Sequence, residues 1–187
     1  MAHTSALAAA RHGLLARQGW DVEAKGLQGS PAIRILANAH HHSSVTRSLR
    51  LLGLGSDCIE PLGGKTPVKV DADVLQAALA QAPYAQTIVI LNAGHLNIGA
   101  CDDFEVLCPV AQASGAWVHV DGAFGLWANA SPRLAPLVKG IALADSWATD
   151  GHKWLNTPYD CGMAITRDPQ AHSAAMRITA AYLSSGG

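Results

Sequence analysis

The hydrophobic positions of this chain form short runs that alternate with stretches of helical periodicity. The run 87–91 is short and rich in β-branched residues, as is typical of a strand buried on both faces of a parallel sheet. Further strands are predicted near 32–37, 116–120, 145–149 and 162–166, with helices near 4–18, 43–53, 71–81 and 103–114. This alternation predicts an α/β fold whose mainly parallel sheet carries helices on both faces.

The remaining segments complete one α/β unit. Asp168 and Pro169 mark the start of a last helix, because aspartate caps helix ends and proline suits the first helical turn. The connection 53–67 is dense in turn residues and is not expected to be a domain boundary. We find no internal repeat and no interdomain linker in the sequence.

Composition narrows the class of protein. The 187 residues are 49% hydrophobic and 14% charged, with a formal net charge of -1, which does not suit a basic nucleic-acid-binding surface. No apolar run approaches the roughly 20 residues of a membrane span, and the first residues lack a signal-peptide pattern. The four cysteines show no CxxC pairing, which favours reduced thiols. We therefore expect a cytoplasmic protein that binds neither nucleic acid nor membrane.

Candidate chemistry gathers at two strand ends. Asp121 and Lys153 each follow a hydrophobic run, and in α/β proteins ligands bind at the carboxyl ends of the strands. A lysine amine can form an imine with an aldehyde cofactor, and a fixed carboxylate can keep a pyridine nitrogen protonated as an electron sink. Taken singly, an aspartate at a strand end is usually a cap and a loop lysine is usually solvated. Their combination predicts a pyridoxal 5'-phosphate site.

Three ordered motifs carry a family resemblance. They are Ala39-His40-His41-His42-Ser43-Ser44-Val45, His119-Val120-Asp121-Gly122-Ala123 and Asp150-Gly151-His152-Lys153-Trp154-Leu155. In this order they resemble the group II pyridoxal-dependent decarboxylases, the family of the glutamate, aromatic-amino-acid and tyrosine decarboxylases. The resemblance implies the large domain of the aspartate aminotransferase-like fold, PLP fold type I.

The resemblance also implies a role for individual residues. Lys153 would hold the cofactor as a Schiff base and Asp121 would pair with its pyridine nitrogen. His42 would stack on one face of the ring, Ala123 would pack on the other, and His152 would approach the phosphate. His95 stands where many members have a threonine, at a contact to cofactor or substrate. Because a lysine must be neutral to act as a nucleophile, burial and nearby cations such as His152 are expected around Lys153.

Length sets the expected domain organisation. Members of this family are more than twice as long, so the resemblance implies that residues 1–187 form a partial PLP-binding large domain. The phosphate-binding Gly-Gly-Thr/Ser turn would lie upstream of Met1. The segment 180–187 ends where the family continues into a mobile catalytic loop and a small C-terminal domain, both expected to be absent.

The function implied by the resemblance is decarboxylation of an L-amino acid, and the resemblance also implies a homodimer in the full-length form. Another fold type I reaction, of an aldolase, desulfurase or aminotransferase, is an alternative, because the same groups prepare a carbanion whichever bond breaks. A third possibility is a truncated, catalytically silent chain.

Two readings involve metals. The run His40-His41-His42 is also consistent with a surface histidine cluster or an adventitious metal site. In a metal hydrolase, His119 and Asp121 would share a strand face, with His152 or His95 as a third ligand. That reading leaves Lys153 unexplained, and we expect no metal.

Overall fold

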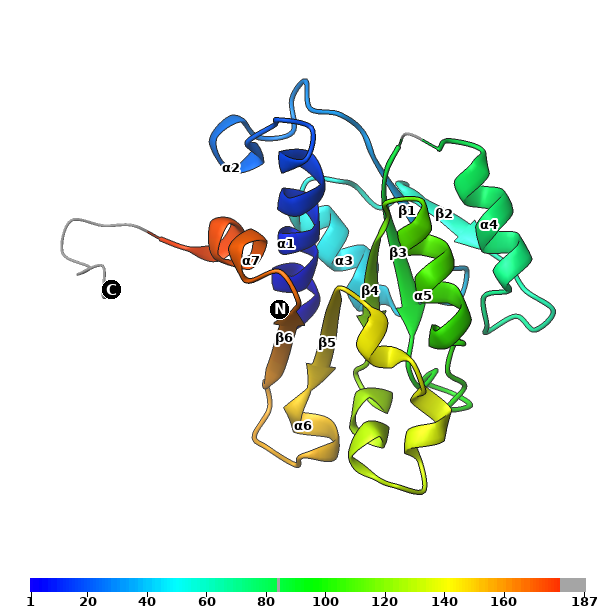
Figure 1. Cartoon of the computed structure of the whole chain (residues 1–187). Coiled ribbons are helices and arrows are strands. Elements are labelled where there is room, and N and C mark those ends of the chain that lie inside the picture. The colour runs from blue at the N-terminus through cyan, green and yellow to red at the C-terminus, as the bar shows by residue number, and fades with distance from the viewer. Residues whose placement is uncertain (84, 179–187) are drawn as a thin grey trace.

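The centre of the molecule is a six-stranded sheet, seen in a computed structural model that describes residues 1–83 and 85–178 (Figure 1). The strand order is β2-β1-β3-β4-β5-β6, with bounds β1 Ile33–Asn38, β2 Ile59–Leu62, β3 Gln86–Asn92, β4 Trp117–Asp121, β5 Ser146–Asp150 and β6 Gly162–Thr166. Neighbouring strands run parallel from β2 to β5, and β6 pairs antiparallel with β5. The predicted α/β class is confirmed. The expectation for the segment 180–187 falls outside the described residues.

Helices cover both faces of this sheet. The α-helices are α1 Ala2–Ala16, α2 Val22–Lys25, α3 Ser43–Leu51, α4 Ala72–Ala80, α5 Phe104–Ala113, α6 Gly151–Trp154 and α7 Pro169–Met176. Three short 3₁₀ helices lie between β4 and β5, at Gly125–Ala130, Ala135–Val138 and Ile141–Leu143. α1, α3 and α7 lie on one face, and α4 and α5 lie on the other (Figure 1).

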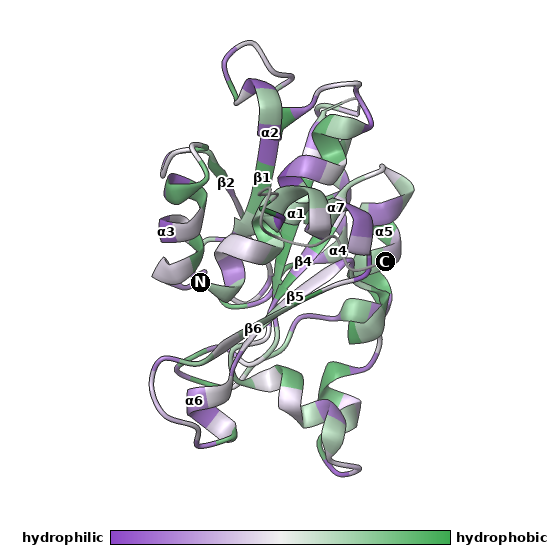
Figure 2. Ribbon diagram, turned by 90° about the vertical axis from the view of Figure 1, so that its left-hand side faces the viewer, coloured by the Kyte–Doolittle hydropathy of each residue, from purple (hydrophilic) through white to green (hydrophobic). Residues whose placement is uncertain are grey.

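The alternation of side chains along each strand divides the core into two layers. Ile35 of β1 packs with Leu7 and Leu49, from α1 and α3, whereas its neighbour Leu36 packs with Leu75 of α4 and with α5. Figure 2 shows hydrophobic residues along the inner strands, between the helical layers. Burial on both faces explains why the strands read as continuous apolar runs.

One strand adds to the sequence-based expectations. The connection 53–67 contains β2, which we had not predicted because its four residues include Pro61 and lie among turn residues. β2 lies at the edge of the sheet, where a proline is tolerated because its missing N–H costs no ladder bond. The four cysteines are free thiols. Within the described residues, no helix is long and apolar enough to cross a membrane.

Candidate functional site

A cavity of about 380 Å³ opens at the carboxyl ends of the parallel strands. Polar side chains reach it from the ends of three neighbouring strands, namely Asn38 of β1, Asn92 of β3 and Asp121 of β4. Lys153 enters from α6, directly after β5. The structure therefore brings Asp121 and Lys153 to one cavity, as their positions at strand ends predict.

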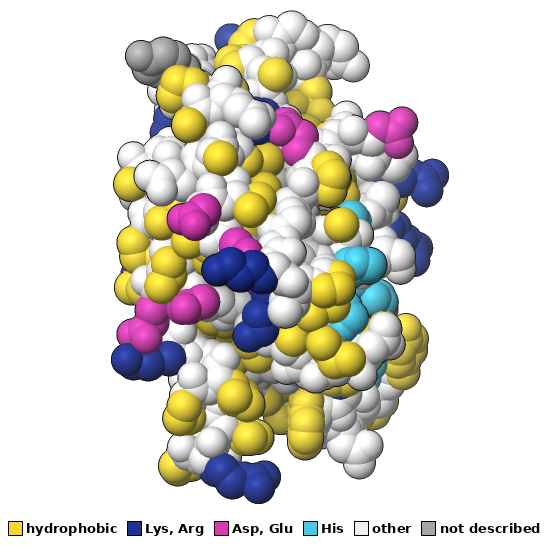
Figure 3. Space-filling model, turned by 90° about the vertical axis from the view of Figure 1, so that its right-hand side faces the viewer, with side chains coloured by type: hydrophobic (Ala, Val, Ile, Leu, Met, Phe, Trp, Pro, Cys, Tyr) yellow, Lys and Arg dark blue, Asp and Glu magenta, His cyan; other side chains and the backbone are white. Residues whose placement is uncertain are grey.

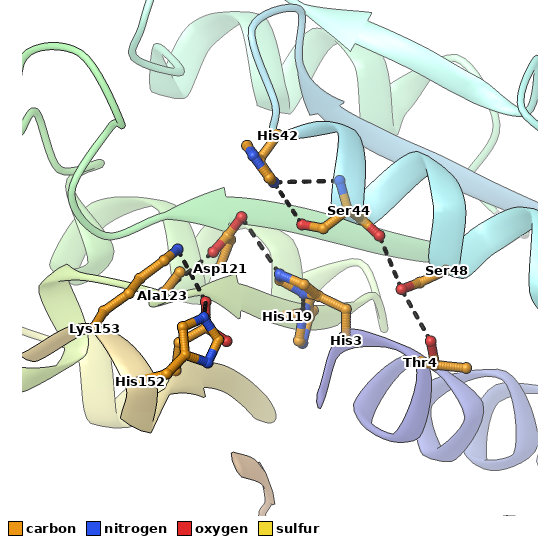
Figure 4. A network of polar contacts seen from close by, with 11 residues as sticks. His3, Thr4, His42, Ser44, Ser48, His119, Asp121, Ala123, His152 and Lys153 are labelled. Carbon is orange, nitrogen blue, oxygen red and sulfur yellow. Dashed lines mark hydrogen bonds and ion pairs between the residues drawn. The ribbon is translucent and has the colours of Figure 1, made fainter. Parts of the chain in front are cut away.

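Asp121 is fixed from both its backbone and its side chain. The Asp121 carbonyl oxygen accepts the N–H of Ala93 at 2.8 Å, and carboxylate Oδ1 accepts the N–H of Ala123 at 3.2 Å. Carboxylate Oδ2 lies 3.5 Å from His3 Nε2 (Figure 4). Burial alone raises the pKa of Asp121, but the His3 imidazole and the Ala123 N–H outweigh burial and bring the pKa to about 2. A carboxylate anion therefore faces the cavity at neutral pH.

Lys153 has an acidic and an aromatic neighbour. Its Nζ lies 2.9 Å from Asp150 Oδ2 and 4.1 Å from the ring centroid of Phe124. We had expected cations such as His152 near this amine. The structure places a carboxylate and a π face beside Nζ, and His152 Nε2 lies 3.9 Å from the same oxygen, Asp150 Oδ2.

His42 and Ala123 line the same cavity. His42 caps the N-terminus of α3, where its Nδ1 accepts the N–H of Ser44 at 3.2 Å and lies 2.7 Å from Ser44 Oγ. This cap fixes the imidazole at the mouth of the cavity, on the side opposite the helix that carries Lys153 (Figure 4).

His95 also lines the cavity, and histidine side chains are visible together at the surface in Figure 3. His95 belongs to a tight turn in which its carbonyl oxygen accepts the N–H groups of Ile98 and Gly99. The backbone beside it is closely packed, because a Cβ on Gly125 would lie only 2.4 Å from the carbonyl oxygen of Ala93.

His152 lies apart from the cavity-lining residues. Its Nδ1 is 2.8 Å from the carbonyl oxygen of Cys161 and 3.1 Å from the Cys161 amide nitrogen, and its ring packs against Tyr159. These contacts fix the loop between β5 and β6. In this structure His152 therefore supports the segment that carries Lys153.

The ring nitrogens of His119 and His41 have protein partners. His119 Nε2 lies 3.0 Å from His3 Nδ1, and His119 Nδ1 lies 2.9 Å from Ser146 Oγ, so neither His119 nitrogen is available to a metal. His41 contacts the carbonyl oxygen of Asn38 at 2.9 Å and Thr46 Oγ1 at 2.9 Å. Within the part of the chain that the structure describes, no group of three or more His, Cys, Asp or Glu side chains has metal-binding geometry.

Five site residues were missed by sequence reasoning. They are His3, Asn38, Asn92, Phe124 and Asp150. Asn38, Asn92 and Asp150 end β1, β3 and β5, so the rule that located Asp121 would have found all three. Phe124 lies one residue beyond the Asp121 motif. No sequence signal connects His3 to Asp121, because their contact depends on how α1 packs against β4.

Asn38 is the least satisfied group in the cavity. It is 5% exposed, its Oδ1 accepts the N–H of His40 at 2.7 Å, and its Nδ2 has no hydrogen-bond partner among the described residues. A buried amide donor without a partner is uncommon in folded proteins and points to a missing acceptor.

Comparisons with known proteins agree with this geometry. The family model described as the pyridoxal-dependent decarboxylase conserved domain matches residues 5–186. The chain is 31% identical over 148 residues to the aromatic-L-amino-acid decarboxylase of Bacillus atrophaeus. This alignment covers 76% of this chain and 30% of that protein. It is 33% identical over 187 aligned positions to the aspartate 1-decarboxylase of Aliivibrio fischeri. This alignment covers 93% of this chain and 34% of that protein.

A solved structure shows the same likeness. The crystal structure of Oryza sativa TDC with PLP and tryptamine matches with a TM-score of 0.83 and 29% identity, covering 99% of this chain and 38% of that one. The chain thus spans about a third of the length of these relatives. On the family model, the relatives and the fold together, this chain belongs to the pyridoxal-dependent decarboxylase family.

Proposed function

We propose that this chain holds pyridoxal 5'-phosphate and supplies the cofactor-binding centre of a decarboxylase acting on an L-amino acid. The observation that carries the proposal is that the carboxylate of Asp121 and the amine of Lys153 reach one cavity from neighbouring strand ends. When bound, the cofactor supplies an electron sink for the electron pair left by the departing carboxylate.

The residues present fit this group. Asp121 offers a buried anion to a protonated pyridine nitrogen, and the orphaned Nδ2 of Asn38 offers a donor to a polar atom of a bound molecule. Lys153 is the attachment point for the aldehyde carbon, with Ala123 and His42 assigned to the two ring faces. We assign His95, which also lines the cavity, to a contact with the cofactor or the substrate.

Lys153 must give up its ion pair to react. The Nζ of Lys153 lies 2.9 Å from Asp150 Oδ2, so the ammonium group must lose a proton and with it this ion pair. Asp150 Oδ2 is close enough to accept that proton. Our proposal therefore assigns Asp150 to the proton transfer that frees the Lys153 amine. His152 holds the loop between β5 and β6 through its Nδ1, and we assign its Nε2, which lies 3.9 Å from Asp150 Oδ2, to the phosphate of the cofactor.

The test is covalent capture of the cofactor. The purified chain is mixed with pyridoxal phosphate, and visible absorption is recorded before and after borohydride reduction, followed by peptide mass spectrometry. We expect a reduced adduct on Lys153 that is lost in Lys153→Ala. Lys139→Ala is the matched control, because Lys139 is also ion-paired, 3.0 Å from Glu105, and lies outside the cavity lining.

The outcomes separate the alternatives. An adduct on Lys153 justifies a screen of amino acids, in which an amine with released carbon dioxide identifies a decarboxylase and a keto acid identifies an aminotransferase. Equal labelling of both lysine variants, or no adduct at all, would refute cofactor binding by this chain and support a catalytically silent one.

A homodimer is also proposed. Several large apolar side chains around the cavity mouth and the Lys153 segment are exposed, namely Leu96, Ile98, Trp154 and Tyr159. An exposed apolar surface of this kind is typical of protein–protein contacts. Sedimentation velocity over a concentration series tests the assembly, and a monomer at all concentrations would contradict it.

A further inference from the structure

A row of buried polar side chains leads away from the cavity beneath Asp121. Trp117 Nε1 donates to Ser146 Oγ at 2.8 Å, and Ser146 Oγ lies 2.9 Å from His119 Nδ1. His119 Nε2 lies 3.0 Å from His3 Nδ1, and His3 Nε2 lies 3.5 Å from Asp121 Oδ2 (Figure 4). All five side chains are buried, so this row is a continuous polar path through the apolar core.

Strand geometry and helix packing build this row. Residues 117, 119 and 121 alternate along β4 and therefore point to the same face of the sheet. The register between β4 and β5 places Ser146 directly beside His119. α1 packs against this face, and its first turn brings His3 between His119 and Asp121.

The direction of hydrogen-bond donation is set at the far end of the row. The Trp117 indole can only donate, so Ser146 Oγ accepts from it. The Ser146 hydroxyl then donates to His119 Nδ1, which leaves the proton of neutral His119 on Nε2. His119 Nε2–H donates to His3 Nδ1, and the proton of neutral His3 is on Nε2, facing Asp121.

The opposite direction satisfies fewer groups. If His119 Nδ1 donated to Ser146, the hydroxyl proton of Ser146 would have no acceptor, because the described residues offer Ser146 Oγ no third partner. A neutral His3 would then present a lone pair to the carboxylate. Each buried unsatisfied group costs about 1–3 kcal/mol, which favours the first direction.

We propose that His3 is a positioning residue that donates its Nε2–H to Asp121 and holds the carboxylate as an anion facing the cavity. The inference rests on the proposed function, in which Asp121 pairs with the pyridine nitrogen of the cofactor. Two pKa shifts agree with it. Burial, the largest cause, lowers the pKa of His119 to about 3, so that His119 is neutral, and the hydrogen bond from His3 lowers the pKa of Asp121 against the effect of burial.

The first test observes the protons directly, without cofactor. Long-range ¹⁵N–¹H correlation spectra of the histidine-labelled chain distinguish Nδ1–H from Nε2–H tautomers. We expect the Nε2–H tautomer for both His3 and His119 near neutral pH. An Nδ1–H tautomer at His119, or protonation of both nitrogens of His3, would overturn the proposed direction.

The second test follows Asp121 itself. Its carboxyl ¹³C shift is titrated in wild type, His3→Gln and His3→Leu. Glutamine can still accept from His119 and donate to the carboxylate, so the titration is expected to stay close to wild type, whereas leucine removes the donor and leaves mainly the Ala123 N–H to oppose burial. We expect the proton affinity of Asp121 to rise by at least about tenfold in His3→Leu, which is one pKa unit.

Thr4→Val is the matched control. Thr4 is the next residue of α1, and its Oγ1 donates to Ser48 at 3.1 Å, outside the row that reaches Asp121. An unchanged Asp121 titration in His3→Leu, or an equal shift in Thr4→Val, would refute the positioning role. If His3→Leu does not fold, the tautomers of wild type and the Asp121 titration in His3→Gln still test the proposal. Neither test uses the cofactor, so a failure of adduct formation at Lys153 is a separate result.

Discussion

His119 makes the stability of this fold sensitive to mild acid. Its side chain is completely buried, and burial lowers its pKa to about 3 from an ordinary value of 6.5. Between these two values the unfolded chain binds a proton at this residue and the folded chain does not. Stability therefore rises with pH through this window and is lost as the pH falls below 6.5 toward 3.

The size of the effect follows from the two pKa values. Integrating the difference in bound protons between pH 7 and pH 5 gives a loss of about 2 kcal/mol. Since domains are stable by only about 5–15 kcal/mol, this is a large fraction of the total. Asp102 works in the opposite sense, because burial raises its pKa, and its contribution is common to wild type and variant.

The assay is urea unfolding, followed by tryptophan fluorescence at pH 7, 6 and 5. His119→Gln loses a constant amount of stability from the altered hydrogen bonds, but it lacks the titrating group. We expect wild type to lose about 2 kcal/mol more than His119→Gln between pH 7 and pH 5.

His172→Gln is the control, because it removes a histidine that is only partly buried. This variant should keep the wild-type pH dependence. Parallel stability curves for wild type and His119→Gln would refute the reasoning, since they would show that His119 binds protons equally in both states.

Three further outcomes can be measured on the same chain. Gly125→Ala should destabilise the fold by about 1–3 kcal/mol, because the new Cβ would lie 2.4 Å from the carbonyl oxygen of Ala93, whereas Gly63→Ala, with open space around it, should change thermal stability by less than about 0.5 kcal/mol; equal effects would contradict this packing argument. Asp102→Asn should cost about 1–3 kcal/mol in chemical denaturation, because the carboxylate accepts two backbone N–H groups and an amide oxygen replaces only one acceptor; wild-type stability would contradict it. Cys108 should resist alkylation until the chain unfolds, because burial raises the pKa of its thiol to about 12, and labelling of Cys108 in the native state, measured by mass spectrometry, would show that the core opens locally.

The sequence alone predicts the site residues that follow simple strand geometry. Asp121 and Lys153 were located because parallel strands present their carboxyl ends at one edge of the sheet, and the structure places both at one cavity there. The predicted helices and strands lie within a few residues of their observed positions, because the strands are buried on both faces, whereas α2, α6 and the three 3₁₀ helices were not predicted.

The remaining features depend on tertiary contacts. β2 was missed because a short edge strand with a proline lacks a strand's sequence pattern. The pairing of His3 with Asp121 requires a helix and a strand that are far apart in sequence, and the ion pair of Lys153 with Asp150 depends on the turn that opens α6. A sequence pattern gives the face on which a residue lies, but not the partner it meets there.

The position of α1 has a consequence for how this chain is made. α1 contacts β5, β6 and α7, which follow it along the chain by more than a hundred residues. Its apolar side chains, including Leu7 and Leu14, are fully buried in the finished fold. During translation this surface must wait for partners that appear more than a hundred residues later, so we expect the nascent chain to need protection by a chaperone until β6 and α7 have emerged.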